Sequence, residues 1–121
     1  MKKRMEVLKA NLTDIKLLLQ ANGSLEGLVP AGQILVDSDH ISFIYLMETH
    51  EEYTYISLNE QIWPDLKIAY EEKLPIWIEW NNQQIELVHF HDEFEFIINN
   101  IKGNHNYGDE MVTKVERIFW T

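Results

Sequence analysis

The chain contains no cysteine, which excludes a disulfide framework and any metal site built from thiolates. It also lacks an apolar run near the ~18 residues that a membrane helix needs, so we expect no membrane partner. The basic opening is similar to the start of a signal peptide, but Glu6, Lys9 and Asn11 interrupt the apolar segment that should follow. We therefore expect a cytoplasmic protein, and a length of 121 residues predicts a single domain, residues 1–121.

Basic residues are scarce: the chain has 10 Lys and Arg against 20 Asp and Glu, a net charge of −10. The imbalance is concentrated in residues 37–95, where 14 acidic residues face two lysines, while the other segments hold six acidic and eight basic residues. An acidic surface repels phosphate, which argues against nucleic-acid binding. The pattern is typical of a solvated acidic surface, and it also suits a basic protein partner or mimicry of nucleic acid.

Motifs for catalysis are also missing. Residues 27–32 have the glycine spacing of a phosphate-binding loop, but Gln33 stands where the lysine belongs and a strand pattern follows. No nucleophile-elbow or zinc-protease motif occurs, and the neighbouring carboxylates at 51–52 and 71–72 lie on polar stretches that nothing would bury. We therefore predict no catalytic residue and no cofactor, which favours a protein that is not an enzyme.

Apolar residues make up 45% of the chain, and in several short segments they alternate as in strands. Residues 41–47 are apolar on both faces, which predicts a central strand covered on both sides. A hairpin, a three-stranded meander and a second hairpin are expected, at 5–10, 15–21, 33–37, 41–47, 53–57, 76–80 and 84–88. The glycines and proline of residues 24–32 predict a loop before the meander.

Three later segments show the apolar spacing of helices. Ser57 and Glu60 match a capping box, and with Pro64 they predict a helix that ends at about Lys73. Residues 92–102 form the second helix, and Asp109 caps the third. The fold class that follows is α+β: a mainly antiparallel sheet of about seven strands with about three helices, two of them C-terminal.

The best metal-ligand candidates are His89, His91 and Glu95, because imidazole and carboxylate groups suit Zn, Mn or Fe. In a strand these three share one face, whereas in a helix only His91 and Glu95 do. Both structures fit residues 89–96; the longer apolar stripe, which ends at Gly103, favours a helix from about residue 92. A further ligand must come from elsewhere, and a solvated first helical turn explains the same residues, so we assign no metal site.

Two regions are candidates for binding. The first is the loop of Asn104, His105, Asn106 and Tyr107, which is dense in hydrogen-bonding groups. The same residue types also suit a left-handed exit from a helix. The second is Trp80, which we expect to be partly exposed beside the Asn81–Asn82 turn.

Residues 31–40 (Ala-Gly-Gln-Ile-Leu-Val-Asp-Ser-Asp-His) and 101–108 (Ile-Lys-Gly-Asn-His-Asn-Tyr-Gly) resemble a family of small acidic proteins from Bacillus and its relatives. The resemblance runs nearly end to end and includes the opening Lys-Lys-Arg-Met-Glu-Val-Leu-Lys. That family is of unknown function, so the resemblance implies a cytoplasmic bacterial protein and transfers no catalytic residue.

These observations favour a non-enzymatic protein-interaction or regulatory module. The alternative is a small-molecule or metal-binding protein that uses His89, His91 and residues 104–107. This alternative includes an enzyme. The second hairpin carries Trp77 and Trp80 at an end of the sheet, which predicts a monomer in equilibrium with a weak homodimer. Because the chain is acidic, the dimer fraction should rise with salt.

Overall fold

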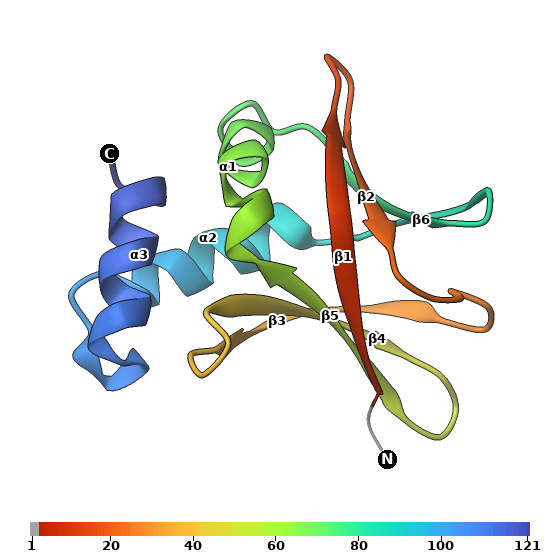
Figure 1. The fold of residues 1–121 in the computed structure, drawn as a ribbon, viewed down its shortest axis with the longest axis horizontal. Helices are drawn as coiled ribbons and strands as arrows, with labels where there is room; N and C mark the ends of the chain where they lie inside the picture. The colour runs from red at the N-terminus through yellow and green to blue at the C-terminus, as the bar shows by residue number, and fades with distance from the viewer. Residues whose placement is uncertain (1–2) are drawn as a thin grey trace.

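Seven strands form one curled sheet in the order β3-β4-β5-β1-β2-β6-β7 in the computed structural model, which describes residues 3–121 (Figure 1). Their bounds are β1 Lys3–Leu12, β2 Leu17–Ala21, β3 Val29–Asp37, β4 Ser42–Glu48, β5 Tyr53–Asn59, β6 Ile76–Trp80 and β7 Gln83–Glu86. Four pairings are antiparallel, whereas β1 with β5 and β2 with β6 are parallel. The predicted α+β class is confirmed, and the parallel pairings make the mainly antiparallel sheet a mixed one.

The first strand joins the two halves of this sheet. Its residues 3–6 pair with β5, and residues 7–12 pair with β2. The register shifts between Val7 and Lys9, which is the sign of a bulge. Because a bulge bends its strand and increases the local twist, β1 changes partners along its length and the sheet curls around it.

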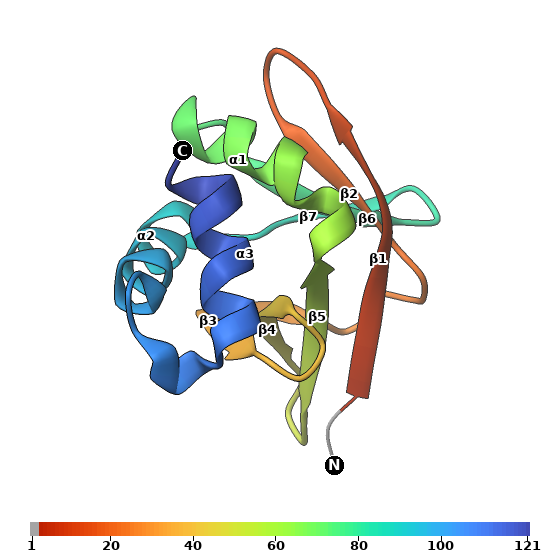
Figure 2. The ribbon, with the colours of Figure 1, turned by 60° about the vertical axis from the view of Figure 1, so that its left-hand side comes forward.

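The helices lie together on one side of the sheet (Figures 1 and 2). Their bounds are α1 Trp63–Glu71, α2 Phe90–Ile101 and α3 Asp109–Phe119, with short 3-10 helices η1 Glu60–Ile62 and η2 His105–Tyr107. Helix α1 packs against β1 and β2, α2 packs against β3, and α3 packs against the other two helices. The helical interpretation of residues 89–96 is confirmed, and the helix begins two residues earlier than predicted because His89 turns the chain with a φ of 62°.

An aromatic cluster closes the space between helices and sheet. Phe43 of β4 lies 5.1 Å from Trp63 and 5.0 Å from Phe94 between ring centroids. Phe119, near the end of α3, lies 5.1 Å from Phe94 and 5.6 Å from Trp63. The indole of Trp63 is 1% exposed and donates to the carbonyl of Leu58 at 3.0 Å, so its one polar group is satisfied. The cluster therefore ties one strand to all three helices.

Both faces of the central strand are buried, as predicted, although the helices cover only one of them. Residues 42–47 of β4 are all buried. Phe43 and Tyr45 point to the helices, and Ile44, which is 2% exposed, lies on the opposite face.

The loop predicted at residues 24–32 is wrong in its second half. β3 begins at Val29, and Val29 and Pro30 pair with Glu48 and Met47 before the register shifts ahead of Ile34. Gly32 lies in this irregular stretch with a φ of 70°, and a Cβ there would come 3.1 Å from the His89 ring. Glycine and proline here therefore mark a bulged edge strand, a structure in which both are common.

The helix caps also differ from the prediction. Ser57 lies inside β5, and η1 is capped by Asn59, whose side chain accepts from the backbone N–H of Gln61 at 3.1 Å. Gly108 is the N-cap of α3, so Asp109 is the first helical residue instead of its cap. The end of a strand followed by the first turn of a helix can contain the same residue types as a capping box. The spacing of Ser57 and Glu60 therefore gave the wrong cap.

The two phenylalanines at 94 and 96 test the aromatic cluster. Phe94 is fully buried, whereas Phe96 on the same helix is 64% exposed. We expect Phe94→Ala to lower the free energy of unfolding by about 3–5 kcal/mol, because it removes a core ring and leaves a cavity. The control Phe96→Ala should change it by no more than about 0.5 kcal/mol in chemical denaturation. Equal losses in the two variants would contradict the packing described.

Candidate functional site

A hollow of about 600 Å³ lies on the sheet face that the helices leave uncovered, called the open face below. Its floor contains side chains from three neighbouring strands: Leu35, Ile44 and Tyr55. Its rim is the turn between β3 and β4, with Asp37, Asp39 and His40 on it, and Arg4 of β1 lies beside them. A volume of a few hundred cubic ångströms is in the range of binding pockets (~300–1,000 Å³), and few polar groups above an apolar floor are typical of such sites.

Arg4 is the centre of the hydrogen bonds on this face. Its Nη1 donates to Asp37 at 2.8 Å and its Nε donates to Glu6 at 3.2 Å. Its Nη2 donates to the hydroxyls of Ser57 at 3.0 Å and Ser42 at 3.4 Å, two side chains that are almost fully buried. Burial lowers the pKa of Arg4, but the hydrogen bonds that it donates to Asp37 and Glu6, together with their negative charges, raise the pKa above its ordinary value. The guanidinium is therefore occupied within the protein and has little to offer an anionic ligand.

Asp37 joins Arg4 to the turn. Its carboxylate accepts from Arg4 and from the ring Nδ1 of His40 at 2.8 Å, and also from the backbone N–H of His40 at 3.2 Å. Burial raises the pKa of Asp37, but these hydrogen bonds lower it more, and the result lies below the ordinary value. In some active sites an aspartate orients a histidine, and the histidine then acts as general base on a serine hydroxyl. Here the neighbouring hydroxyls of Ser42 and Ser57 accept hydrogen bonds from Arg4 instead. Neither serine is therefore paired with His40 as an activated nucleophile would be.

Asp39 is the carboxylate that remains available at the rim. It is exposed, and within residues 3–121 it makes no hydrogen bond or ion pair. The hollow thus combines an apolar floor with a free negative charge, while its one arginine is neutralised by Asp37 and Glu6. This arrangement suits a group with an aliphatic stem and a cationic end, such as a lysine or arginine side chain.

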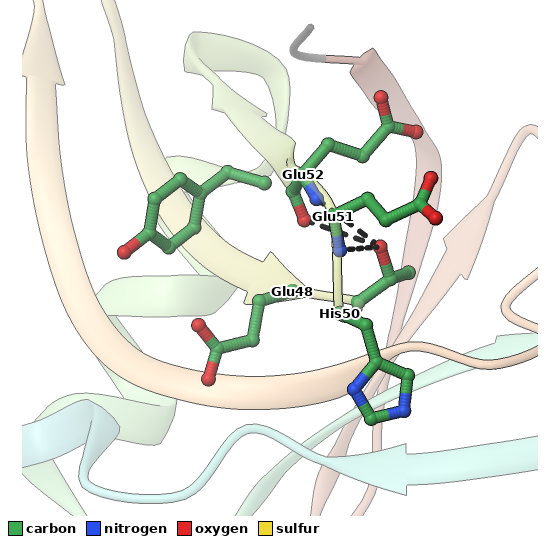
Figure 3. Close-up of a pocket in the computed structure, with 6 residues that line it drawn as sticks. Glu48, His50, Glu51 and Glu52 are labelled. Atoms are coloured by element: carbon green, nitrogen blue, oxygen red, sulfur yellow. Dashed lines mark hydrogen bonds between the residues drawn. The ribbon is translucent and has the colours of Figure 1, made fainter.

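A second, smaller hollow of about 200 Å³ lies at the turn between β4 and β5 (Figure 3). The hydroxyl of Thr49 accepts from the backbone N–H groups of Glu51 and Glu52, both at 3.3 Å, and so fixes the turn. Figure 3 shows that the carboxylates of Glu51 and Glu52 point away from Glu48 and His50. These charges therefore do not converge on one point, and they extend the acidic surface instead of forming a cation site.

The three metal-ligand candidates do not converge either. His89 is exposed ahead of α2, the Nε2 of His91 lies 2.6 Å from the carbonyl oxygen of Leu74, and Glu95 accepts from the Tyr70 hydroxyl at 3.2 Å. Across residues 3–121, no three His, Asp or Glu side chains are grouped so that they could hold a metal ion. His89 and His91 nevertheless line one hollow of about 280 Å³, and the Nδ1 of His91 is buried without a partner.

The predicted binding residues fall into two separate places. Asn104 caps η2 by accepting from the N–H of Asn106 at 3.2 Å, His105 pairs with Asp109 at 2.8 Å, and Tyr107 is half-buried against the core. Trp80 is 37% exposed beside the β6–β7 turn, and this turn lies on the opposite side of the molecule from the connection between α2 and α3 (Figures 1 and 2). The structure does not bring these residues together into one site.

Sequence reasoning did not find the hollow on the open face. Arg4 and Asp37 are 33 residues apart, and Arg4 and Ser57 are 53 apart, so strand order alone makes them neighbours. Arg4 offered one signal in the sequence. A cationic side chain on a sheet needs acceptors on the neighbouring strands, so its presence predicts polar partners nearby.

Comparison with known proteins gives the chain its family. A model described as a family of unknown function, UPF0738, matches residues 5–119. The chain belongs to this family. The UPF0738 protein YjbL of Bacillus subtilis is 43% identical over 121 residues, which cover 98% of this chain and 99% of that protein. A UPF0738 protein of Bacillus licheniformis is 46% identical over the same shares, and one of Geobacillus sp. is 38% identical over the full length of both chains.

The resemblance to Bacillus proteins of unknown function is thereby confirmed. No solved structure matches this UPF0738 chain at a significant level. Within its described residues, no helix has the length and apolar character needed to cross a membrane.

Replacing Arg4 tests the hydrogen bonds of the open face. Arg4→Met keeps the length of the side chain but removes one of the donors to Asp37 and the guanidinium that donates to two buried hydroxyls. We therefore expect the free energy of unfolding to fall by roughly 1–3 kcal/mol at neutral pH. The lowered pKa of Asp37 stabilises the fold above the carboxyl's unfolded pKa of about 3.9, and this contribution is lost as pH falls through the folded pKa. The difference in free energy of unfolding between Arg4→Met and the parent should therefore become smaller as the pH is lowered.

The matched control is Lys3→Met, which removes the same charge from the same strand. Lys3 is exposed and its nitrogen lies 3.8 Å from Glu52, a surface pair worth ~0–1 kcal/mol. Thermal or chemical unfolding across a pH series measures both variants. A loss in Arg4→Met that does not depend on pH would rule out Asp37 as the coupled group.

Proposed function

We propose that this protein is a non-enzymatic interaction module of the bacterial cytoplasm, and that its open sheet face binds a basic segment of a protein partner. The observation that carries the proposal is the hollow over Leu35, Ile44 and Tyr55, with the unpaired carboxylate of Asp39 at its rim. An apolar floor can bury the methylene groups of a lysine or arginine, and the carboxylate can pair with the charged end.

The distribution of charge supports the same type of partner. Residues 37–95 carry 14 acidic side chains and two lysines, and they include most of the walls of the hollow. The basic groups next to the hollow do not offset this charge, because Arg4 is paired with two carboxylates. A field of one sign attracts an oppositely charged partner over a Debye length and raises its association rate.

A defined peptide can test the proposal without knowledge of the natural partner. We expect a lysine- and leucine-containing basic peptide to shift the backbone NMR signals of Leu35, Ile44 and Tyr55, with an affinity that falls as salt is added. Asp39→Lys should weaken binding at least about tenfold, since it replaces an attractive charge with a repulsive one, a change of more than ~1.4 kcal/mol.

The matched control is Glu71→Lys, which makes the same change of charge at an exposed position on α1. If the peptide binds through net charge alone, both variants lose the same affinity and the proposed site is wrong. Signal changes confined to the β4–β5 turn would move the binding surface to Glu48, Glu51 and Glu52.

A second candidate function, small-ligand or metal binding at His89 and His91, is favoured by one observation. The Nε2 of His91 faces the carbonyl oxygen of Leu74, which can only accept, so Nε2 carries the proton. The buried Nδ1 then has a free electron pair and no partner, which is the form in which imidazole binds a metal. Glu86 and Asp92 also line this hollow, but within residues 3–121 no three such side chains are grouped to hold a metal ion. An ion at this place would therefore need water or a small ligand to complete its coordination.

Zinc titration followed by thermal unfolding tests this second candidate. It requires that Zn²⁺ raise the Tm of the parent and that His89→Asn abolish the rise; asparagine tolerates the left-handed backbone that His89 adopts. His50→Asn, in the distant β4–β5 turn, is the control and should keep the rise. No change in the Tm of the parent would remove the metal form of this candidate.

A further inference from the structure

The two ends of the sheet are unequally protected. β3 forms one end and β7 the other, and α2 packs against β3. Among the elements described here, β6 is the one with which β7 packs extensively. The β6–β7 hairpin projects from the body of the molecule on the side away from the helices (Figures 1 and 2). One edge of the sheet is therefore accessible to another strand.

The register shows which backbone groups this edge presents. Trp80 pairs with Gln83 and Ile78 pairs with Ile85 around the Asn81–Asn82 turn. In a hairpin with two residues in its turn, these pairs exchange their N–H and C=O groups, so the groups of Gln84 point away from β6. Within residues 3–121, Gln84 has no backbone partner for either group, whereas the carbonyl of Glu86 accepts from Val88 at 3.1 Å.

The side chain of Gln84 is held in place by its neighbours. Its Nε2 donates to Glu79 at 2.8 Å, and its Oε1 accepts from Lys16 at 3.1 Å. Glu79 also accepts from Gln20 at 2.7 Å, so a row of polar side chains crosses β2, β6 and β7. Lys16 offsets the charge of Glu79, and Glu86 is the acidic residue that remains on this strand. The edge is ordered and carries less net charge than the rest of the acidic surface.

We propose that β7 pairs with β7 of a second copy of this chain, antiparallel and about a two-fold axis at Gln84. In this register, each Gln84 donates its N–H to the carbonyl oxygen of the other, and Glu86 lies opposite Asn82 instead of opposite a second carboxylate. About a two-fold axis, the N–H and C=O groups of the two Gln84 residues pair with each other, so both open edges gain partners at once. This self-complementarity is the reason to choose a second copy of the chain as the partner of β7.

Apolar contact supports this register on the other face of the ribbon. Trp80 is paired with Gln83, so their side chains lie next to each other on one face of the hairpin. The proposed pairing puts Ile85 of the second copy opposite Gln83, on the same face and in line with Trp80. Trp80 is 37% exposed and Ile85 is half-buried in the single chain, so the contact would cover apolar surface. The short edge and the net charge of −10 make the dimer weak and favour it at high salt.

Proline at position 84 gives a selective test. Gln84→Pro removes an N–H that β6 does not use, and an edge strand tolerates proline at such a position. Gln84→Ala is the matched control, because it removes the same side chain and keeps the N–H. In sedimentation velocity at high salt, we expect the parent and Gln84→Ala to dimerise, and Gln84→Pro to dissociate about tenfold more readily or worse, since two hydrogen bonds are lost.

Hydrogen exchange gives a second measurement that needs no variant. Exchange of the Gln84 amide should slow as the parent protein is concentrated at high salt. The amide of the exposed residue Glu110, in the first turn of α3 and outside the proposed interface, serves as a reference. Circular dichroism and thermal unfolding establish that Gln84→Pro is folded. A strict monomer at high concentration and high salt would overturn the proposal. A dimer that Gln84→Pro leaves intact, with no slower exchange at Gln84, would do so as well.

Discussion

The structure depends on the division of one strand between two partners. Residues 3–6 of β1 pair with β5, and residues 7–12 pair with β2, so β1 alone connects the half of the sheet made by β3, β4 and β5 to the half made by β2, β6 and β7. The bulge at residues 7–9 lets the strand serve both. Within residues 3–121, no other strand pairing joins the two halves, which otherwise meet through side chains and the helices.

The same strand separates an inner face from an outer one. Met5 and Val7 are buried in the core, whereas Arg4 and Glu6 face away from the helices and make the hydrogen bonds of the open face. On that face, the arginine holds Asp37 of β3 and the buried hydroxyls of β4 and β5, so its charge stabilises four strands and is not available to a ligand. An apolar hollow with a free carboxylate remains, and this is why a cationic group suits it better than an anionic one.

Local patterns predicted most of the elements and few of the long-range contacts. Alternation identified β4 as a doubly covered strand, and the apolar stripe with Gly103 identified α2, because each pattern lies within one element. The parallel pairing of β1 with β5 joins residues about fifty positions apart, and no local pattern encodes such a pairing. The site was missed for the same reason, since Arg4, Asp37 and Ser57 meet only after the strands take their order. The sequence predicts a loop where the structure has a bulge at Gly32, because turns and bulges use the same residues.

The position of Phe119 has a consequence for the synthesis of the protein. This ring packs against Phe43, Trp63 and Phe94, all of which come earlier in the chain. The aromatic core is therefore incomplete until α3 has left the ribosome, and β1 must wait for β5, which is made later. Pairings between such distant segments slow folding. During that interval the nascent chain exposes unpaired strands, and the repulsion among its many carboxylates would help to keep neighbouring chains apart.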